Sequence, residues 1–207
     1  MHLAARVGGL QYNLAHPGSI FRDNMAAFLS VIEAAQQERV DRLLVTSSAC
    51  VYPRDCSVPT PEAEGFVGRP EPSNEGYGWV KRMQEFLGDA YAREYGMQVR
   101  VVRPYNAYGP RDNFDESSSH VIPALIRRVV RGDNPLVVWG DGRATRSFLY
   151  VTDFARGLLA ATEYGTNAEP INLGSDEEVT IGHLARLVIE ESDSAAQVLF
   201  DSSKPVG

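Results

Sequence analysis

The sequence predicts an α/β protein with a doubly wound parallel sheet. Short apolar runs of strand length alternate with segments whose apolar residues repeat at helical spacing, and turn-forming Gly and Pro residues separate them. The chain has 207 residues, of which 43% are hydrophobic and 23% charged, which is the balance of a folded globular protein. This length suits one domain with a smaller second lobe.

The first half alternates helix and strand signals regularly. Apolar residues at Met25, Phe28 and Ile32 share one helical face, whereas RLLVTS and QVRVVR are runs of strand length. From the N-terminal side, the predicted elements are a helix over 24–39, a strand over 42–47, a Pro-rich loop over 53–72, a helix over 77–95 closed by Gly96, and a strand over 98–103 stopped by Pro104.

The second half is less regular, so we place a domain boundary near residue 110. The first domain then spans residues 1–110 and the second 111–207, with some strands and helices returning to the first. The predicted elements here are a helix over 118–131 with Pro123 in its first turn, strands over 136–139 and 147–151, a helix over 152–163, a strand over 171–173, a helix from Thr180 to about 191, and a strand over 197–200.

Composition excludes several classes of function. The net charge of -7 argues against a nucleic-acid surface, because phosphate binding needs clustered Lys and Arg. Two cysteines, Cys50 and Cys56, are too few for a disulfide framework and show no metal-ligand spacing, so we expect no metal and a reducing, cytoplasmic setting. No apolar run approaches the roughly 20 residues that span a bilayer, so we expect no membrane partner.

The pair Tyr77 and Lys81 carries the first chemical signal. The spacing of four residues places both side chains on one helical face. A phenol ionises near pH ~10, and a nearby ammonium lowers that pKa, which favours proton transfer at a carbinol carbon. Ser48, upstream, can hold the substrate oxygen. By itself this pattern occurs by chance in many helices, where the two residues are a surface pair.

The order of several motifs makes the signal specific. Downstream of the TSSACVYP strand end come a Pro-rich loop and NEGYGWVK, and the chain also carries HLAA, VGG, RPYNAYGP, DNF, SHVIP, WGDG and RSFL. Together they resemble the extended short-chain dehydrogenases/reductases that act on nucleotide sugars, the NAD-dependent epimerase/dehydratase family. The resemblance implies part of a Rossmann-type, doubly wound cofactor domain with a smaller mixed α/β substrate lobe.

Within that family the run DNFDESSSHVIPALIRR and the terminal DSSKPVG resemble the GDP-L-fucose synthases. These enzymes epimerise C3 and C5 of GDP-4-keto-6-deoxy-mannose and reduce its C4 ketone with NADPH to GDP-L-fucose. The resemblance implies NADP as cofactor, with NAD possible, a GDP-sugar substrate and a homodimer. It also implies catalytic residues (Ser48, Tyr77, Lys81, Cys50 and His120), cofactor contacts (Ala4, Ser47, Ser48, Tyr77, Lys81, Pro104, Asn106, Ala107 and His120) and substrate contacts (Arg128, Trp139, Arg146 and Lys204).

The implied roles of Cys50 and His120 agree with their chemistry. Inverting a carbon next to a ketone needs a base on one face and an acid on the other. A thiol with a pKa near ~8.5 and an imidazole near ~6.5 can exchange protons around neutral pH. The alternatives are purely structural roles: Cys50 as a small buried residue at a strand end, and His120 as a polar helix-cap residue.

Other functions stay open at this stage. Ala49, between Ser48 and Cys50, resembles GDP-mannose 3,5-epimerase, whereas His120 favours the synthases, because the epimerase uses lysine in the acid role. A redox-neutral epimerase or dehydratase that recycles tightly held NAD is therefore one alternative. A non-catalytic protein that keeps the fold is another.

The sequence contains no glycine-rich turn between a strand and a helix, where this fold holds the pyrophosphate. The chain starts at HLAA, where the family would be in its fourth strand, and the first βαβ segment is missing. We therefore expect an internal fragment that by itself does not bind NADP(H) with useful affinity. The residue that selects NAD or NADP would lie in the absent part.

Overall fold

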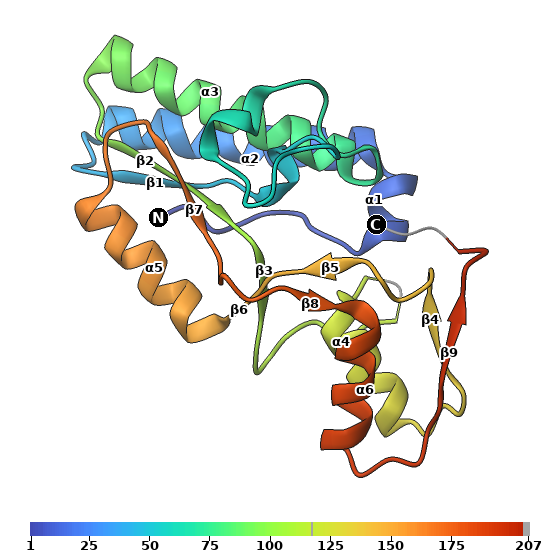
Figure 1. The fold of residues 1–207 in the computed structure, drawn as a ribbon. Helices are drawn as coiled ribbons and strands as arrows, with labels where there is room; N and C mark the ends of the chain where they lie inside the picture. Colours follow the sequence, from blue (N-terminus) through green and yellow to red (C-terminus); the bar gives the residue numbers. More distant parts are fainter. Residues whose placement is uncertain (117, 205–207) are drawn as a thin grey trace. The chain divides into compact units, whose positions relative to one another are not determined.

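The predicted alternation of helices and strands is present in the computed structural model, which describes residues 1–116 and 118–204 (Figure 1). The α/β class is thereby confirmed. Contacts divide the chain into two units, which we describe separately. Unit 1 comprises residues 1–7, 13–105 and 151–174, and unit 2 comprises residues 8–12, 106–150 and 175–207.

A three-stranded parallel sheet organises unit 1. Its strand order is β1 (Leu43–Thr46), β2 (Val99–Pro104) and β7 (Pro170–Leu173). The register pairs Leu43 with Val99 and Val102 with Ile171, and His2 forms an isolated parallel bridge to Val45 on the other side of β1. All three carboxyl ends therefore lie at the same edge of the sheet, where ligands of open α/β sheets bind.

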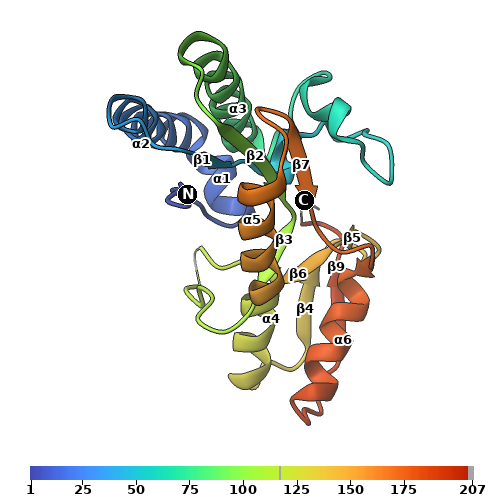
Figure 2. The same cartoon turned by 90° about the vertical axis from the view of Figure 1, so that its left-hand side faces the viewer.

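Helices cover both faces of this sheet. The long helices α2 (Pro17–Gln37) and α3 (Glu75–Tyr95) pack on one face, and α5 (Val151–Tyr164) packs on the other (Figures 1 and 2). Because side chains alternate along a strand, Leu43 and Val45 pack against α2 and α3, whereas Leu44 packs against α5 on the opposite face. This two-sided burial explains why β1 reads as an uninterrupted apolar run.

A long connection joins β1 to α3 through three short 3₁₀ helices, η1 (Ala49–Val51), η2 (Glu62–Phe66) and η3 (Pro72–Asn74). Arg82 of α3 ties this connection down: it is 1% exposed and donates to the carbonyl oxygens of Val51 at 2.9 Å and Gly68 at 2.6 Å. Buried carbonyl oxygens need hydrogen-bond donors, and this one arginine supplies them to two separate turns of the loop.

Unit 2 is a smaller mixed lobe. Its core lies between α4 (Val121–Val130), α6 (Ile181–Glu191) and the parallel pair β4 (Leu136–Trp139) and β9 (Val198–Asp201). Two further short pairs complete it: β3 (Asn106–Tyr108) runs parallel to β6 (Phe148–Tyr150), and β5 (Thr145–Arg146) runs antiparallel to β8 (Val179–Thr180).

Local signals placed several helix ends correctly, but α2 begins at Pro17 and not at the predicted residue 24. Gly96 adopts the left-handed conformation (φ 68°) and ends α3, and the Thr180 hydroxyl accepts from the His183 amide at 3.1 Å at the start of α6. Pro123 lies in the first turn of α4. Sequence analysis missed α1 (Leu10–Ala15) and the strands β3, β5 and β8, because elements of two to six residues show no periodicity. No helix among the described residues is long and apolar enough to cross a membrane.

Candidate active site

The carboxyl end of β1 presents Ser48 and Cys50. The chain leaves the strand at Ser47 and turns at once into η1, and the Ser48 hydroxyl oxygen accepts from the Cys50 amide at 3.1 Å. Ser48 and Cys50 are partly exposed, and neither Cys50 nor Cys56 forms a disulfide. The serine oxygen thereby fixes the turn that carries the thiol.

Tyr77 and Lys81 lie in the first two turns of α3, as their spacing predicted. The ammonium of Lys81 is 5.3 Å from the centroid of the Tyr77 ring. Gly78 allows this helix to reach η1, because a Cβ at that position would clash with the Cys50 carbonyl oxygen. The structure therefore brings Tyr77, Lys81 and Cys50 together, with Ser48 in the same turn.

Burial controls the charges of this cluster. It raises the pKa of Tyr77 above its ordinary value, and negative charge on Cys50 raises it further. Our expectation that Lys81 lowers the pKa of Tyr77 is therefore wrong for this structure, because desolvation of the phenolate outweighs the nearby ammonium. Burial likewise lowers the pKa of Lys81 to about 8, against the opposing effect of negative charge on Cys50 and Glu85. A neutral phenol beside a titratable ammonium is an arrangement suited to donating a proton.

Lys81 is held by two neutral oxygens. Its side chain is 2% exposed, and Nζ donates to the Thr46 carbonyl at 2.7 Å and to the Gln84 amide oxygen at 3.1 Å. An ammonium has three donors, so one N–H remains for a further acceptor. This remaining donor fits a hydroxyl group of a cofactor ribose or of a sugar.

A second buried network surrounds Glu85, one turn along α3 from Lys81. Its carboxylate accepts two hydrogen bonds from Arg103 of β2, at 2.9 and 2.7 Å, and a third from the Ser47 hydroxyl. Arg103 also donates to the Tyr52 hydroxyl at 3.0 Å, and this hydroxyl donates to Asn172 at 2.6 Å. The network joins β1, β2, β7 and α3 at one edge of the sheet, which is the edge that carries Ser48.

His120, expected to pair with Cys50, lies in unit 2. It is exposed at the N-cap position of α4, where its side chain makes no capping hydrogen bond and its carbonyl accepts from Ala124 at 3.0 Å. The His120 side chain therefore neither caps α4 nor packs in a core. Cys50 and His120 belong to different units, so their pairing stays a prediction.

The four expected substrate residues are also in unit 2. The ammonium of Lys204 lies 6.0 Å from the centroid of the Trp139 ring at the end of β4. Arg128 is partly committed, because it donates to Asp133 at 3.0 Å and to the Val137 carbonyl at 2.6 Å. Arg146, on β5, donates to the Thr145 carbonyl at 2.6 Å. Of these four residues, the structure places Lys204 over the ring of Trp139.

The remaining expected cofactor contacts differ in accessibility. Ala4, Asn106 and Ala107 are exposed, and Pro104 is half-buried at the end of β2. Asn106 donates to the Ser147 carbonyl at 3.0 Å. Ser47 is buried, and its hydroxyl is engaged with Glu85. Direct contact of Ser47 with a cofactor stays a prediction.

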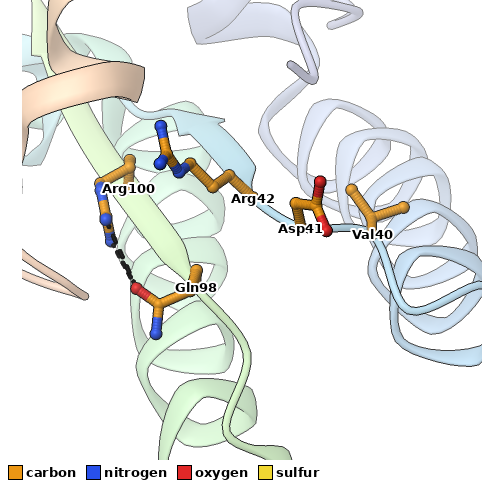
Figure 3. Close-up of a pocket in the computed structure, with 5 residues that line it drawn as sticks. All are labelled: Val40, Asp41, Arg42, Gln98 and Arg100. Atoms are coloured by element: carbon orange, nitrogen blue, oxygen red, sulfur yellow. Dashed lines mark hydrogen bonds between the residues drawn. The ribbon is translucent and has the colours of Figure 1, made fainter.

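A hollow of about 830 Å³ lies at the other end of the sheet. It is lined by residues just before β1 and β2, including Arg42 and Gln98, together with Arg100 (Figure 3). These are the amino ends of the strands, whereas Ser48 follows the carboxyl end of β1. This hollow is therefore separate from the cluster around Ser48. Among residues 1–116 and 118–204, no three His, Cys, Asp or Glu side chains gather as metal ligands.

Sequence analysis overlooked the supporting residues. Gln84, Asn24, Glu85 and Arg103 are all at most 5% exposed and all bond within unit 1. One signal was available, because Glu85 follows Lys81 by four residues and shares its helical face. The partners across the sheet gave none.

Comparisons with known proteins agree with this geometry. The model of the "NAD dependent epimerase/dehydratase family" matches residues 1–174. GDP-L-fucose synthase of Escherichia coli (strain K12) is 38% identical over 99% of this chain and 68% of its own length. GDP-L-colitose synthase of Yersinia pseudotuberculosis is 32% identical over 100% of this chain and 69% of its own length. The chain spans about two thirds of the length of the curated relatives it matches.

Solved structures show the same relationship. A GDP-L-fucose synthetase from Naegleria fowleri bound to NADP is 29% identical, with a TM-score of 0.87 over 99% of this chain and 64% of that one. UDP-glucose 4-epimerase from Thermotoga maritima is 28% identical, with a TM-score of 0.87 over 97% of this chain and 62% of that one.

Proposed function

Because the chain belongs to the NAD-dependent epimerase/dehydratase family, we propose that its protein converts a nucleotide sugar by epimerisation and reduction. The proposed reaction takes GDP-4-keto-6-deoxy-mannose to GDP-L-fucose by inversion at C3 and C5 and reduction at C4. One observation carries the proposal: the partly exposed Tyr77 and the buried Lys81 share a helical face beside the turn that bears Ser48 and Cys50. A non-catalytic protein that keeps the fold would not need this cluster.

The cofactor that fits is NADPH, and when bound it supplies the hydride for C4. The free N–H of Lys81 at the carboxyl edge of the sheet suits a ribose hydroxyl, and a relative of similar fold is bound to NADP. Ala4, Pro104, Asn106 and Ala107 are the further proposed contacts, with a homodimer as the proposed assembly.

The side chains of this cluster divide the reduction step. Tyr77, neutral because burial raises its pKa, gives its phenolic proton to the C4 oxygen as the carbon is reduced. Lys81, charged below pH about 8, then stabilises the phenolate that remains. Ser48 holds the same oxygen by its hydroxyl and thereby orients the ketone.

Epimerisation uses the same carbonyl as an electron sink. The C4 ketone delocalises the carbanion at C3 or C5 as an enolate, whose oxygen Ser48 and Tyr77 stabilise. Cys50 removes the proton from one face, and His120 returns a proton to the other. Cys50 interacts electrostatically with Lys81, whose ammonium favours negative charge on a neighbouring group.

Nucleotide recognition is proposed for unit 2. Trp139 offers a ring face for the base, and Lys204, 6.0 Å from that ring, offers positive charge for a phosphate. Arg128 and Arg146 add cations on α4 and β5.

Exchange of substrate protons with solvent tests the epimerisation roles. In an active preparation of the protein, we expect Cys50→Ser and His120→Asn each to slow deuterium incorporation at C3 and C5 on the order of 10²-fold. Reduction of an already epimerised 4-keto sugar should change far less in both variants. Unchanged exchange in both would remove Cys50 and His120 from the mechanism.

A redox-neutral nucleotide-sugar epimerase is the second candidate, because Ala49 departs from the synthase pattern and an epimerase structure superposes equally well. Product analysis separates the two. Stoichiometric oxidation of NADPH supports the synthase, whereas an epimerised product with no net change in cofactor supports the epimerase.

A further inference from the structure

The polar partner of Lys81 on its own helix is Gln84, and nothing in the proposed mechanism uses it. Gln84 is 1% exposed, and its amide oxygen accepts from Lys81 Nζ at 3.1 Å. A buried amide is costly unless its donors and acceptors are satisfied. Its position three residues after Lys81 places both side chains on one face of α3.

The other end of this amide is fixed by α2. Gln84 Nε2 donates to the Asn24 carbonyl oxygen at 3.1 Å. Asn24 is 2% exposed, and its own side chain is held by the backbone of Arg6 at 2.8 and 2.9 Å and by the Ile20 carbonyl at 2.8 Å. The amide is therefore anchored to a rigid part of α2.

These partners explain the residue type. The Asn24 carbonyl can only accept and the Lys81 ammonium can only donate, so the side chain between them must donate at one end and accept at the other. A glutamine amide does both, and its orientation is set by its two neighbours. A carboxylate would face the carbonyl oxygen with no proton, and an apolar side chain would leave both groups unsatisfied.

The charged groups around Lys81 leave its hydrogen bonding to neutral oxygens. On α3, Tyr77 is neutral, and Glu85, whose negative charge favours the ammonium of Lys81, is itself bound by Arg103 and Ser47. Cys50 of η1 and His2, which bridges to β1, are the other titratable groups that interact with Lys81. No carboxylate among the described residues forms an ion pair with this ammonium, so Gln84 and the Thr46 carbonyl are its recorded acceptors.

We propose that Gln84 is a positioning residue that holds the Lys81 ammonium protonated and directed at Tyr77, through a relay anchored on Asn24. The inference rests on the proposed function for its catalytic meaning. The hydrogen-bond role itself is independent of any substrate.

Selective labelling makes this role measurable. The chain contains only two lysines, Lys81 and Lys204, so ¹³Cε-lysine gives two side-chain signals, which Lys81→Arg assigns. We expect Gln84→Met, which keeps the length but removes the acceptor, to lower the pKa of Lys81 by about one unit. Gln84→Glu, which adds an adjacent negative charge, should raise that pKa by about one unit.

Controls separate positioning from general damage. Gln98→Leu makes a similar change at the opposite edge of the sheet, where Gln98 contacts Arg100, and should leave the Lys81 titration unchanged. The Lys204 signal is the internal reference in every variant. The opposite signs of the two Gln84 variants cannot arise from loosened packing alone, and amide dispersion reports whether each variant is folded. Equal Lys81 titrations in wild type, Gln84→Met and Gln84→Glu would overturn the proposal.

Activity then distinguishes this inference from the proposed function. In an active preparation of the protein, the alkaline limb of the pH profile of kcat/KM for C4 reduction should move to lower pH in Gln84→Met and to higher pH in Gln84→Glu. Titration shifts in Lys81 without a matching shift in the limb would support the positioning role and contradict the proposed use of Lys81 in reduction.

Discussion

The two units treat their functional side chains differently. In unit 1, Lys81 is 2% exposed and donates to the Thr46 carbonyl at the end of β1, and desolvation raises the pKa of Tyr77. In unit 2, Trp139 is 37% exposed and His120 lies at a helix start with no capping bond from its side chain. The contrast fits the roles proposed above, in which unit 1 supplies the buried side chains for reduction and unit 2 supplies exposed side chains for recognition and the His120 imidazole for epimerisation.

The energetic contrast follows from burial. The pair Glu85 and Arg103 is 5% and 2% exposed, so its charges are withdrawn from water. In unit 2, Asp133 is 21% exposed and its partners Arg128 and Arg131 are 23% and 52% exposed, so water reaches these charges and screens them. Similar hydrogen bonds therefore carry different weight in the two units.

The largest expected effect is on catalysis in unit 1. Tyr77→Phe removes the phenolic proton donor and keeps the ring, so we expect C4 reduction to fall on the order of 10²–10⁴-fold. Stability should stay close to wild type. Single-turnover reduction of the 4-keto sugar measures the step directly. Near-wild-type turnover would show that Tyr77 is not the proton donor and would contradict the proposed role of unit 1.

The next effect compares two ion pairs. Glu85→Gln leaves the buried Arg103 without its carboxylate, and we expect a loss of about 3–5 kcal/mol in the free energy of unfolding. The same change at the surface, Asp133→Asn, should cost less than about 1 kcal/mol. Chemical denaturation of both variants measures the difference, and equal costs would mean that burial does not separate the two networks.

A third effect tests the burial of Lys81 through pH. Burial lowers its pKa from 10.5 to about 8, so below pH about 8 the folded state carries the full penalty of a buried charge. Between these values the unfolded chain keeps the proton and the folded chain loses it, so stability rises with pH, by up to about 3 kcal/mol. Lys81→Met should lack this rise. Parallel curves of unfolding free energy against pH for the two proteins would show that Lys81 is not desolvated.

The smallest effect is expected for recognition. Trp139→Ala removes the ring that faces Lys204, and we expect the KM for the GDP-sugar to rise about tenfold with kcat nearly unchanged. Steady-state kinetics with an active preparation of the protein gives both parameters. A loss confined to kcat would instead assign Trp139 to the chemistry and erase the division of labour proposed here.

Local residue patterns predicted more of the fold than of the site. The helix α3 ended at Gly96 as expected because a C-cap depends on its own backbone conformation, and β1 was visible because burial on both faces leaves an apolar run. The spacing of Tyr77 and Lys81 was likewise decisive, since four residues of helix determine a shared face. By contrast, the sign of the pKa shift of Tyr77 was mispredicted, because desolvation depends on everything packed around the phenol.

The sequence by itself determined the α/β class, the shared helical face of Tyr77 and Lys81, and the resemblance that the comparisons confirm, because these depend on residues near one another in the chain or on the order of motifs. Only the tertiary structure decided which groups support that pair. Lys81 bonds to a carbonyl 35 positions away, Gln84 to one 60 positions away, and Tyr52 to a side chain 120 positions away. Buried polar groups must find partners wherever the fold brings them, and no pattern of neighbouring residues predicts where that is.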